Sequence, residues 1–164
     1  GRVYWFATRN APEGEDDGPA GSRAALLGAF CGWHEPVEVL IRATDEDAIL
    51  RTDIYDRDPL GKTWGAGRAT LLGDAAHPMT PNLGQGACQT IEDAVVLARR
   101  LRAFRESGEA GDTAGALRRY EVLRADRTAA IVRRSRRIGT VGQLENRFLC
   151  WLRDRTLKMV PAER

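Results

Sequence analysis

The stretch 68–94 constrains the fold of this chain more than any other part of the sequence. Residues 69–72 form a short apolar run between two glycines, which is the pattern of a buried strand. Residues 73–83 contain two prolines and no apolar periodicity, which predicts a loop. From Gly84 onward apolar residues recur at helical spacing, so a helix is expected to begin at or just after Gly84-Gln85-Gly86.

This order of elements predicts a ligand site. In open α/β sheets, ligands bind beyond the carboxyl end of a strand and at the start of the helix that follows. Asp74 lies at that end of the strand, where its carboxylate could accept hydrogen bonds from the hydroxyls of a sugar or polyol. The amides around Gln85 could meet an oxygen that carries negative charge, because the helix dipole is positive there.

The run GDAAHPMTPNLGQGACQTIEDA, residues 73–94, resembles the second FAD-binding motif of the para-hydroxybenzoate hydroxylase-like aromatic hydroxylases, which are single-component FAD monooxygenases. The resemblance implies that Asp74 binds the ribityl hydroxyls, that the backbone of residues 83–87 faces the pyrimidine edge of the flavin, and that Pro81 lies beside the ring. The cofactor-binding residues expected on this basis are Gly73, Asp74, Pro81, Leu83, Gly84, Gln85, Gly86 and Ala87.

The family implies an enzyme that binds FAD without a covalent bond. NAD(P)H would reduce the flavin, and one oxygen atom would pass to an aromatic or olefinic small molecule. No residue is assigned a catalytic role, although Arg57 is a plausible contributor to the flavin or nicotinamide approach. A flavin-dependent halogenase or an oxidase on a related fold is an alternative. A halogenase would need a lysine between flavin and substrate, and neither Lys62 nor Lys158 lies in the motif.

The expected fold is α/β, or an α+β fragment: the C-terminal part of a Rossmann-like FAD-binding domain with part of a β-sheet substrate domain and C-terminal helices. Strands are expected at 3–8 and 49–55. We expect residues 1–58 to belong to the substrate domain, 59–107 to the FAD domain, and 108–164 to bracing helices. The Gly-x-Gly-x-x-Gly half of the FAD site does not occur in the sequence, which indicates the C-terminal portion of a longer enzyme. Its missing N-terminal part would then be a partner of this chain.

Several helix boundaries follow from local signals. Ser22 is expected to cap a helix that runs to Cys31, Pro36 opens a second, and residues 44–47 resemble a capping box. Residues 108–115 form a Gly-rich linker. Helices are expected at 114–138 and 143–158. Gly139 and Gly142 are expected to interrupt the helix between them, and Pro161 is expected to end the last helix.

Charge is unevenly distributed, with twelve acids and six arginines in residues 1–58 but twelve arginines and five acids in residues 99–137. A nucleic-acid module is one interpretation of this asymmetry. We favour solvated helix faces and packing against an acidic neighbour, because no nucleic-acid motif accompanies the charge. A non-catalytic fragment or partner chain is a further alternative, and an oligomer is compatible with the sequence. No transmembrane segment is expected, and three cysteines without redox spacing favour the cytoplasm.

The two histidines and Cys88 invite functional interpretations that the sequence does not favour. A metal site needs more ligands at fixed spacing than His34 and His77 supply, so no metal is expected. In the family, the segment that contains His34 is a structural turn. The family histidine at the position of His77 is packed at the cofactor loop. Cys88 is expected to be a small buried residue.

Overall fold

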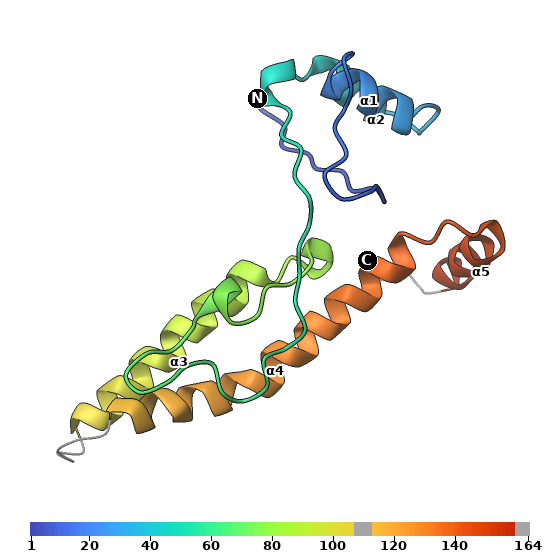
Figure 1. The fold of residues 1–164 in the computed structure, drawn as a ribbon. Helices are drawn as coiled ribbons and strands as arrows, with labels where there is room; N and C mark the ends of the chain where they lie inside the picture. Colours follow the sequence, from blue (N-terminus) through green and yellow to red (C-terminus); the bar gives the residue numbers. More distant parts are fainter. Residues whose placement is uncertain (107–112, 160–164) are drawn as a thin grey trace. The chain divides into compact units, whose positions relative to one another are not determined.

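The computed structural model describes residues 1–106 and 113–159, and it divides into two compact units, Gly1–Ile54 and Tyr55–Arg164 (Figure 1). The first unit contains α1 (Ser22–Ala29), α2 (Val37–Ala43) and the 3-10 turn η1 (Glu46–Ala48). The second contains the 3-10 turns η2 (Gly73–Ala75) and η3 (Pro81–Leu83) and the helices α3 (Gly86–Glu106), α4 (Thr113–Gly142) and α5 (Arg147–Lys158).

In the first unit, α1 packs against α2. Phe30, just after α1, is buried and meets the ring of Trp33 edge to face, with 5.1 Å between centroids. Trp5 Nε1 donates a hydrogen bond of 2.9 Å to Thr44 Oγ1, at the C-terminal end of α2. This bond ties the N-terminal segment to the helix pair.

Two local predictions in this unit are corrected. Ser22 is the first helical residue of α1 rather than its cap, and its hydroxyl donates to Asp17 at 2.5 Å. The predicted capping box at 44–47 is wrong, because the Thr44 hydroxyl donates backward to Leu40 O at 2.7 Å. The short turn η1 that follows has no side-chain cap. The threonine hydroxyl satisfies the carbonyl of the preceding helix instead.

The core of the second unit lies between α3, α4 and the chain that precedes them. The two long helices run side by side (Figure 1). The buried cluster consists of Trp64, Ala76, Tyr120 and Ala125, with Val96 and Leu97 packed against it. The Trp64 and Tyr120 rings meet edge to face, with 5.6 Å between centroids.

The residues that the structure describes form no β-strand, so the strands predicted at 3–8, 49–55 and 69–72 are wrong as strands, and the sheet is not confirmed. Segment 69–72 precedes η2, and its last residue, Leu72, is extended with φ −145° and ψ 147°. Side chains of α4 satisfy its backbone, which a neighbouring strand would otherwise do. Arg118 donates to Ala69 O at 2.9 Å, and the Tyr120 hydroxyl donates to Leu71 O at 3.3 Å.

A buried glutamate on α4 holds the same segment. The Glu121 carboxylate accepts from Trp64 N at 3.1 Å and from the Thr70 hydroxyl at 2.5 Å, and it pairs with Arg118 at 2.8 Å. The side chain of Glu121 has no exposed surface. Residues 64–71 are therefore fixed to α4 on both sides of the Gly65–Gly67 stretch.

The long C-terminal helices are present, with changed boundaries. Gly139, which was predicted to interrupt the helix, lies inside α4, and α4 ends at Gly142. The last helix begins at Arg147 rather than at Gln143, because the Asn146 side chain caps it by accepting from the amides of residues 148 and 149. The predicted linker at 108–115 overlaps α4 at 113–115 and otherwise lies outside the described residues, as does Pro161.

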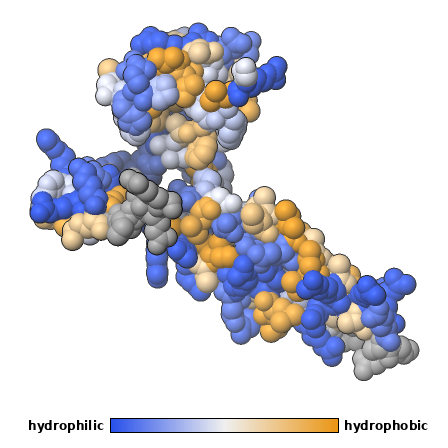
Figure 2. Space-filling model, turned by 180° about the vertical axis from the view of Figure 1, so that it is seen from behind, coloured by the Kyte–Doolittle hydropathy of each residue, from blue (hydrophilic) through white to orange (hydrophobic). Residues whose placement is uncertain are grey.

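Apolar side chains reach the surface of both units among the charged ones (Figure 2). Tyr4 and Leu50 in the first unit are each 88% exposed, and Ile91 and Phe148 in the second are 65% and 66% exposed. Large exposed apolar areas typically mark surfaces that pack against something else. Within the described ranges, no helix is long and apolar enough to cross a membrane.

Candidate functional site

Asp74 lies in η2, and its side chain is directed toward the start of α3. The residue is exposed. Its Oδ1 atom lies 4.0 Å from the point where a Cβ atom would stand on Gly86, the first residue of α3. The carboxylate and the first turn of that helix are thus on the same side of the molecule.

The turn before α3 contains a glycine in the left-handed conformation. Gly84 adopts the left-handed conformation with φ 60° and ψ 26°, and its amide donates to Pro81 O at 2.9 Å. The first amides of an α-helix have no partner inside the helix, and they carry the positive end of its dipole. Of the predicted residues here, Pro81, Gly84 and Ala87 are exposed, while Leu83, Gln85 and Gly86 are half-buried.

Gly73 differs from the other predicted cofactor residues because it is buried against α3. Its φ of 60° is a conformation that side chains disfavour, and a Cβ atom there would lie 2.7 Å from Thr90 Oγ1. Its amide donates to Asp93 Oδ2 at 3.0 Å. Gly73 therefore anchors the turn that carries Asp74.

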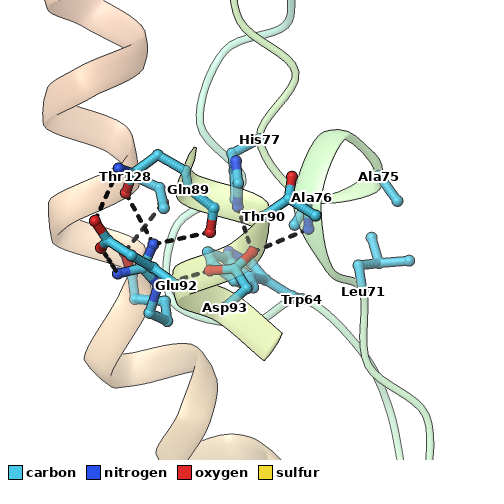
Figure 3. A network of polar contacts seen from close by, with 12 residues as sticks. Trp64, Leu71, Ala75, Ala76, His77, Gln89, Thr90, Glu92, Asp93 and Thr128 are labelled. Atoms are coloured by element: carbon cyan, nitrogen blue, oxygen red, sulfur yellow. Dashed lines mark hydrogen bonds and ion pairs between the residues drawn. The ribbon is translucent and has the colours of Figure 1, made fainter. Parts of the chain in front are cut away.

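Asp93 on α3 is the centre of a buried polar network (Figure 3). Its carboxylate has no exposed surface and contacts His77 Nε2 at 2.6 Å and Arg124 Nε at 2.6 Å, in addition to the Gly73 amide. Burial raises the pKa of Asp93, but the hydrogen bonds from these three groups outweigh burial and lower it below its usual value. The carboxylate is therefore charged, and it holds both ends of segment 73–77.

Arg124 connects this network to the rest of α3. Its guanidinium contacts Glu92 at 2.7 Å and donates to the side-chain and backbone oxygens of Gln89 at 2.8 and 3.2 Å. Glu92 also receives two hydrogen bonds from Arg127, at 2.7 and 2.8 Å. Hydrogen bonds from Arg127 and Arg124 lower the pKa of Glu92 to about 2. The pairing fixes α4 against α3 at the level of the candidate site.

Sequence reasoning missed the role of Asp93, to which it assigned no function. The sequence nevertheless indicated a buried acid near α4. Arg124 interrupts an otherwise apolar or small stripe on the helix predicted at 114–138. An arginine at a core position needs an acid opposite it. His77 is buried beside Trp64, with ring centroids 5.5 Å apart, in agreement with a packed residue at the loop.

Arg57 contacts the turn that carries Asp74, and Cys88 differs from its expected environment. Arg57 donates to the carbonyls of Ala75 and Ala76 at 2.8 and 3.1 Å, so it holds the back of the η2 turn. The acids on either side of Arg57, Asp56 and Asp58, pair with Arg136 at 2.7 and 2.5 Å. Cys88 is exposed rather than buried, because it lies on the outward face of the first turn of α3.

No group of three metal-ligating side chains occurs among residues 1–106 and 113–159. His34 is exposed, and its Nδ1 lies 2.9 Å from the carbonyl oxygen of Glu35. His77 is buried, and its Nε2 contacts the Asp93 carboxylate at 2.6 Å. The site consists of one exposed carboxylate, an open helix start and a buried network behind them.

Comparison with known proteins identifies the kind of site. A family model described as "FAD binding domain" matches residues 38–135. Aurachin C monooxygenase/isomerase of Stigmatella aurantiaca is 52% identical over 100% of this chain and 41% of that protein. The chloroplastic zeaxanthin epoxidase of Nicotiana plumbaginifolia is 50% identical over 80% of this chain and 20% of its own length.

Solved structures agree with these relatives. Klebsiella pneumoniae HpxO, in complex with FAD and uric acid, matches with a TM-score of 0.78 and 36% identity over 92% of this chain and 36% of that one. The chain thus spans less than half the length of each of these three relatives. On the family model and these similarities, the chain belongs to the FAD-binding family of aromatic hydroxylase-like monooxygenases.

Proposed function

We propose that this chain forms the C-terminal part of the FAD site of a monooxygenase, which uses NAD(P)H and oxygen to hydroxylate or epoxidise an aromatic or olefinic small molecule. The observation that carries the proposal is the position of the Asp74 carboxylate beside the first turn of α3. A monooxygenase and an epoxidase among the relatives support the reaction class.

The residues present fit a flavin. Asp74 supplies an exposed acceptor for ribityl hydroxyls, and the amides at the start of α3 supply donors for an electron-rich ring edge. Beyond Gly84 and its two chain neighbours, no atom lies within 4 Å of the position that a Cβ would take on Gly84, so a flat ring could approach the backbone there. When bound, the flavin would supply the redox chemistry.

The chain's own contribution is binding and electrostatics. The charged Asp93 holds Gly73 and His77 on either side of Asp74, which fixes the direction of that carboxylate. The dipole of α3 would stabilise negative charge that develops near its first amides. Pro81, exposed at the start of η3, would line the ring. No acid or base on this chain is needed for these roles.

We also propose domain roles and a partner for this chain. We assign residues 1–58 to the substrate domain, 59–107 to the FAD domain and 108–164 to bracing helices. The remaining part of the FAD site would come from the rest of a longer protein, since the relatives are longer and apolar side chains are exposed on both units. A cytoplasmic location is proposed on the three free thiols.

Two alternatives lose support from the contacts. Lys62, one candidate for a halogenase lysine, pairs with Asp126 at 3.2 Å on an exposed surface. A nucleic-acid module would leave its arginines free for phosphates. Arg124, Arg127 and Arg136 pair with acids of this chain.

The test is Asp74→Ala in the full natural polypeptide that carries these residues. Loss of hydrogen bonds to a charged acceptor should weaken FAD binding by roughly 10- to 100-fold. Asp126→Ala is the matched control, because it removes an exposed carboxylate of the same unit that pairs with Lys62, away from the candidate site. Flavin fluorescence gives the Kd, and incorporation of labelled oxygen into a product shows the reaction class. Unchanged FAD binding in Asp74→Ala would refute the assigned site, and a wild-type protein that binds no flavin would favour an inert fragment.

A further inference from the structure

The turn that carries Pro81 is attached to the C-terminal half of α4. The buried hydroxyl of Ser135 donates to the backbone carbonyl of Thr80 at 2.6 Å, and it accepts from the Thr80 hydroxyl at 3.0 Å. Both bonds involve the residue immediately before Pro81. One side chain of α4 thus holds the chain at the entry to η3.

The residue after Pro81 is held in the same way. Asn82 Nδ2 donates to the backbone carbonyl of Ser135 at 3.3 Å. The same amide nitrogen lies closer than van der Waals contact to the point where a Cβ would stand on Gly139. Residues 135 and 139 are four apart on a helix, so they share one face. Pro81 is therefore flanked by two residues that rest on a single patch of α4.

This contact gives Gly139 a role that the helix itself does not require. Glycine is disfavoured relative to alanine in a helix interior, and Gly139 lies within α4 without ending it. Any side chain at this position would meet the Asn82 amide. Gly142, in contrast, has nothing within 4 Å of its Cβ position. Of these two glycines, only Gly139 has a side chain of the 80–84 turn, that of Asn82, at the position where its Cβ would stand.

We propose that Ser135 and Gly139 form a seat on α4 that positions the 80–84 turn for the cofactor. They are positioning residues, because they act through Thr80 and Asn82 on Pro81 and on the open amides that follow. The proposal rests on the proposed FAD site. In this arrangement α4 positions the backbone that faces the flavin, and it also packs against α3.

The first test compares Gly139→Ala with Gly142→Ala in the full natural polypeptide. Gly139→Ala should displace the Asn82 side chain and raise the Kd for FAD by roughly three- to tenfold, the range that one lost hydrogen bond gives. Gly142→Ala makes the same chemical change in the same helix without a contact and should leave the Kd unchanged. Since alanine favours helix, both variants are expected to retain α4, and circular dichroism checks this.

The second test needs no cofactor. Amide hydrogen exchange of a peptide covering residues 79–84 should be faster in Gly139→Ala and in Ser135→Ala than in the wild type, and unchanged in Gly142→Ala. In an Asn82→Ala background, Gly139→Ala should have no further effect, because the displaced amide is gone. An additional effect in that background would refute the contact as the cause.

The outcomes separate this inference from the proposed function. Unchanged exchange and unchanged FAD binding in Gly139→Ala would overturn the seat, whatever Asp74→Ala does. Faster exchange with unchanged FAD binding would overturn its role in positioning the cofactor. A weakened FAD complex in Gly139→Ala together with faster exchange would support it, and Asp74→Ala independently reports whether the flavin site lies here.

Discussion

The burial of Arg124 makes a prediction that can be tested against a neighbour of the same type. Arg124 is 3% exposed and contacts Asp93 at 2.6 Å and Glu92 at 2.7 Å. Arg127, one turn further along α4, contacts the same Glu92 at 2.7 Å, but it is 58% exposed. The two arginines therefore share an acceptor and differ in burial.

Removing one partner of a buried ion pair costs about 3–5 kcal/mol, because the other charge is left uncompensated. In Arg124→Leu, Asp93 would lose the guanidinium and keep its contacts with His77 and the Gly73 amide. With a urea slope of about 2 kcal/mol per molar, this loss lowers the unfolding midpoint by roughly 1.5–2.5 M. Arg127→Leu should shift it far less, since exposed pairs contribute little.

The assay is urea unfolding of the purified chain, followed by circular dichroism, with both variants and the wild type measured at neutral pH. Equal midpoint shifts for Arg124→Leu and Arg127→Leu would refute the argument, because they would show that burial does not decide the contribution. A changed slope in Arg124→Leu would indicate a less compact native or denatured state, and the midpoint would then be compared only after fitting the slope separately.

Two further predictions concern pH. The pKa of Glu92 is lowered from 4.5 to about 2 in the folded chain. The charged carboxylate therefore contributes to the free energy of unfolding above pH 4.5, and this contribution is lost as the pH falls toward 2. The urea midpoint of Glu92→Gln should vary less with pH across that window than the midpoint of the wild type. Burial, and then the charge of Asp93, raise the pKa of Tyr120 above its usual 10.0. The folded state therefore holds this proton more tightly, stability falls as the pH rises above 10, and Tyr120→Phe should remove part of that fall. The ultraviolet absorbance change that is present in the wild type and absent in Tyr120→Phe should occur well above pH 10; a change at the usual pKa of tyrosine in the folded chain would contradict this.

The sequence predicted the helices better than the strands, and the reason is the range of the interactions. The contacts that define α3 and α4 lie three or four residues apart, so apolar spacing alone locates them. A strand exists only when its backbone pairs with another strand. Segment 69–72 has the right composition, yet its carbonyls accept from Arg118 and Tyr120 of α4, far away in the sequence. No local pattern reveals such a partner.

Helix ends were less predictable, because their chemistry depends on tertiary contacts. Asn146 caps α5 with two amide contacts, a signal that the sequence contained but that the apolar pattern obscured. Thr44 lies at a position that suits a capping box, yet its hydroxyl bonds to the preceding helix and to Trp5. Gly139 suggested a helix break because glycine disfavours helix, whereas its neighbour in space, Asn82, explains why it is there.

The candidate site shows the same division between local and distant information. The motif correctly located where a helix begins after a loop, because glycine, proline and apolar spacing are local signals. What it could not indicate is that Asp93 holds the loop from behind, since that role depends on Arg124 and His77 arriving from two other segments. Arg124 was nonetheless visible as a charge inside a buried stripe. A charge at a core position predicts an opposite charge in contact with it, so a search of the neighbouring helix for an acid about two turns from its start points to the adjacent pair Glu92 and Asp93. Which of the two is buried behind the loop depends on the contacts with His77 and Gly73.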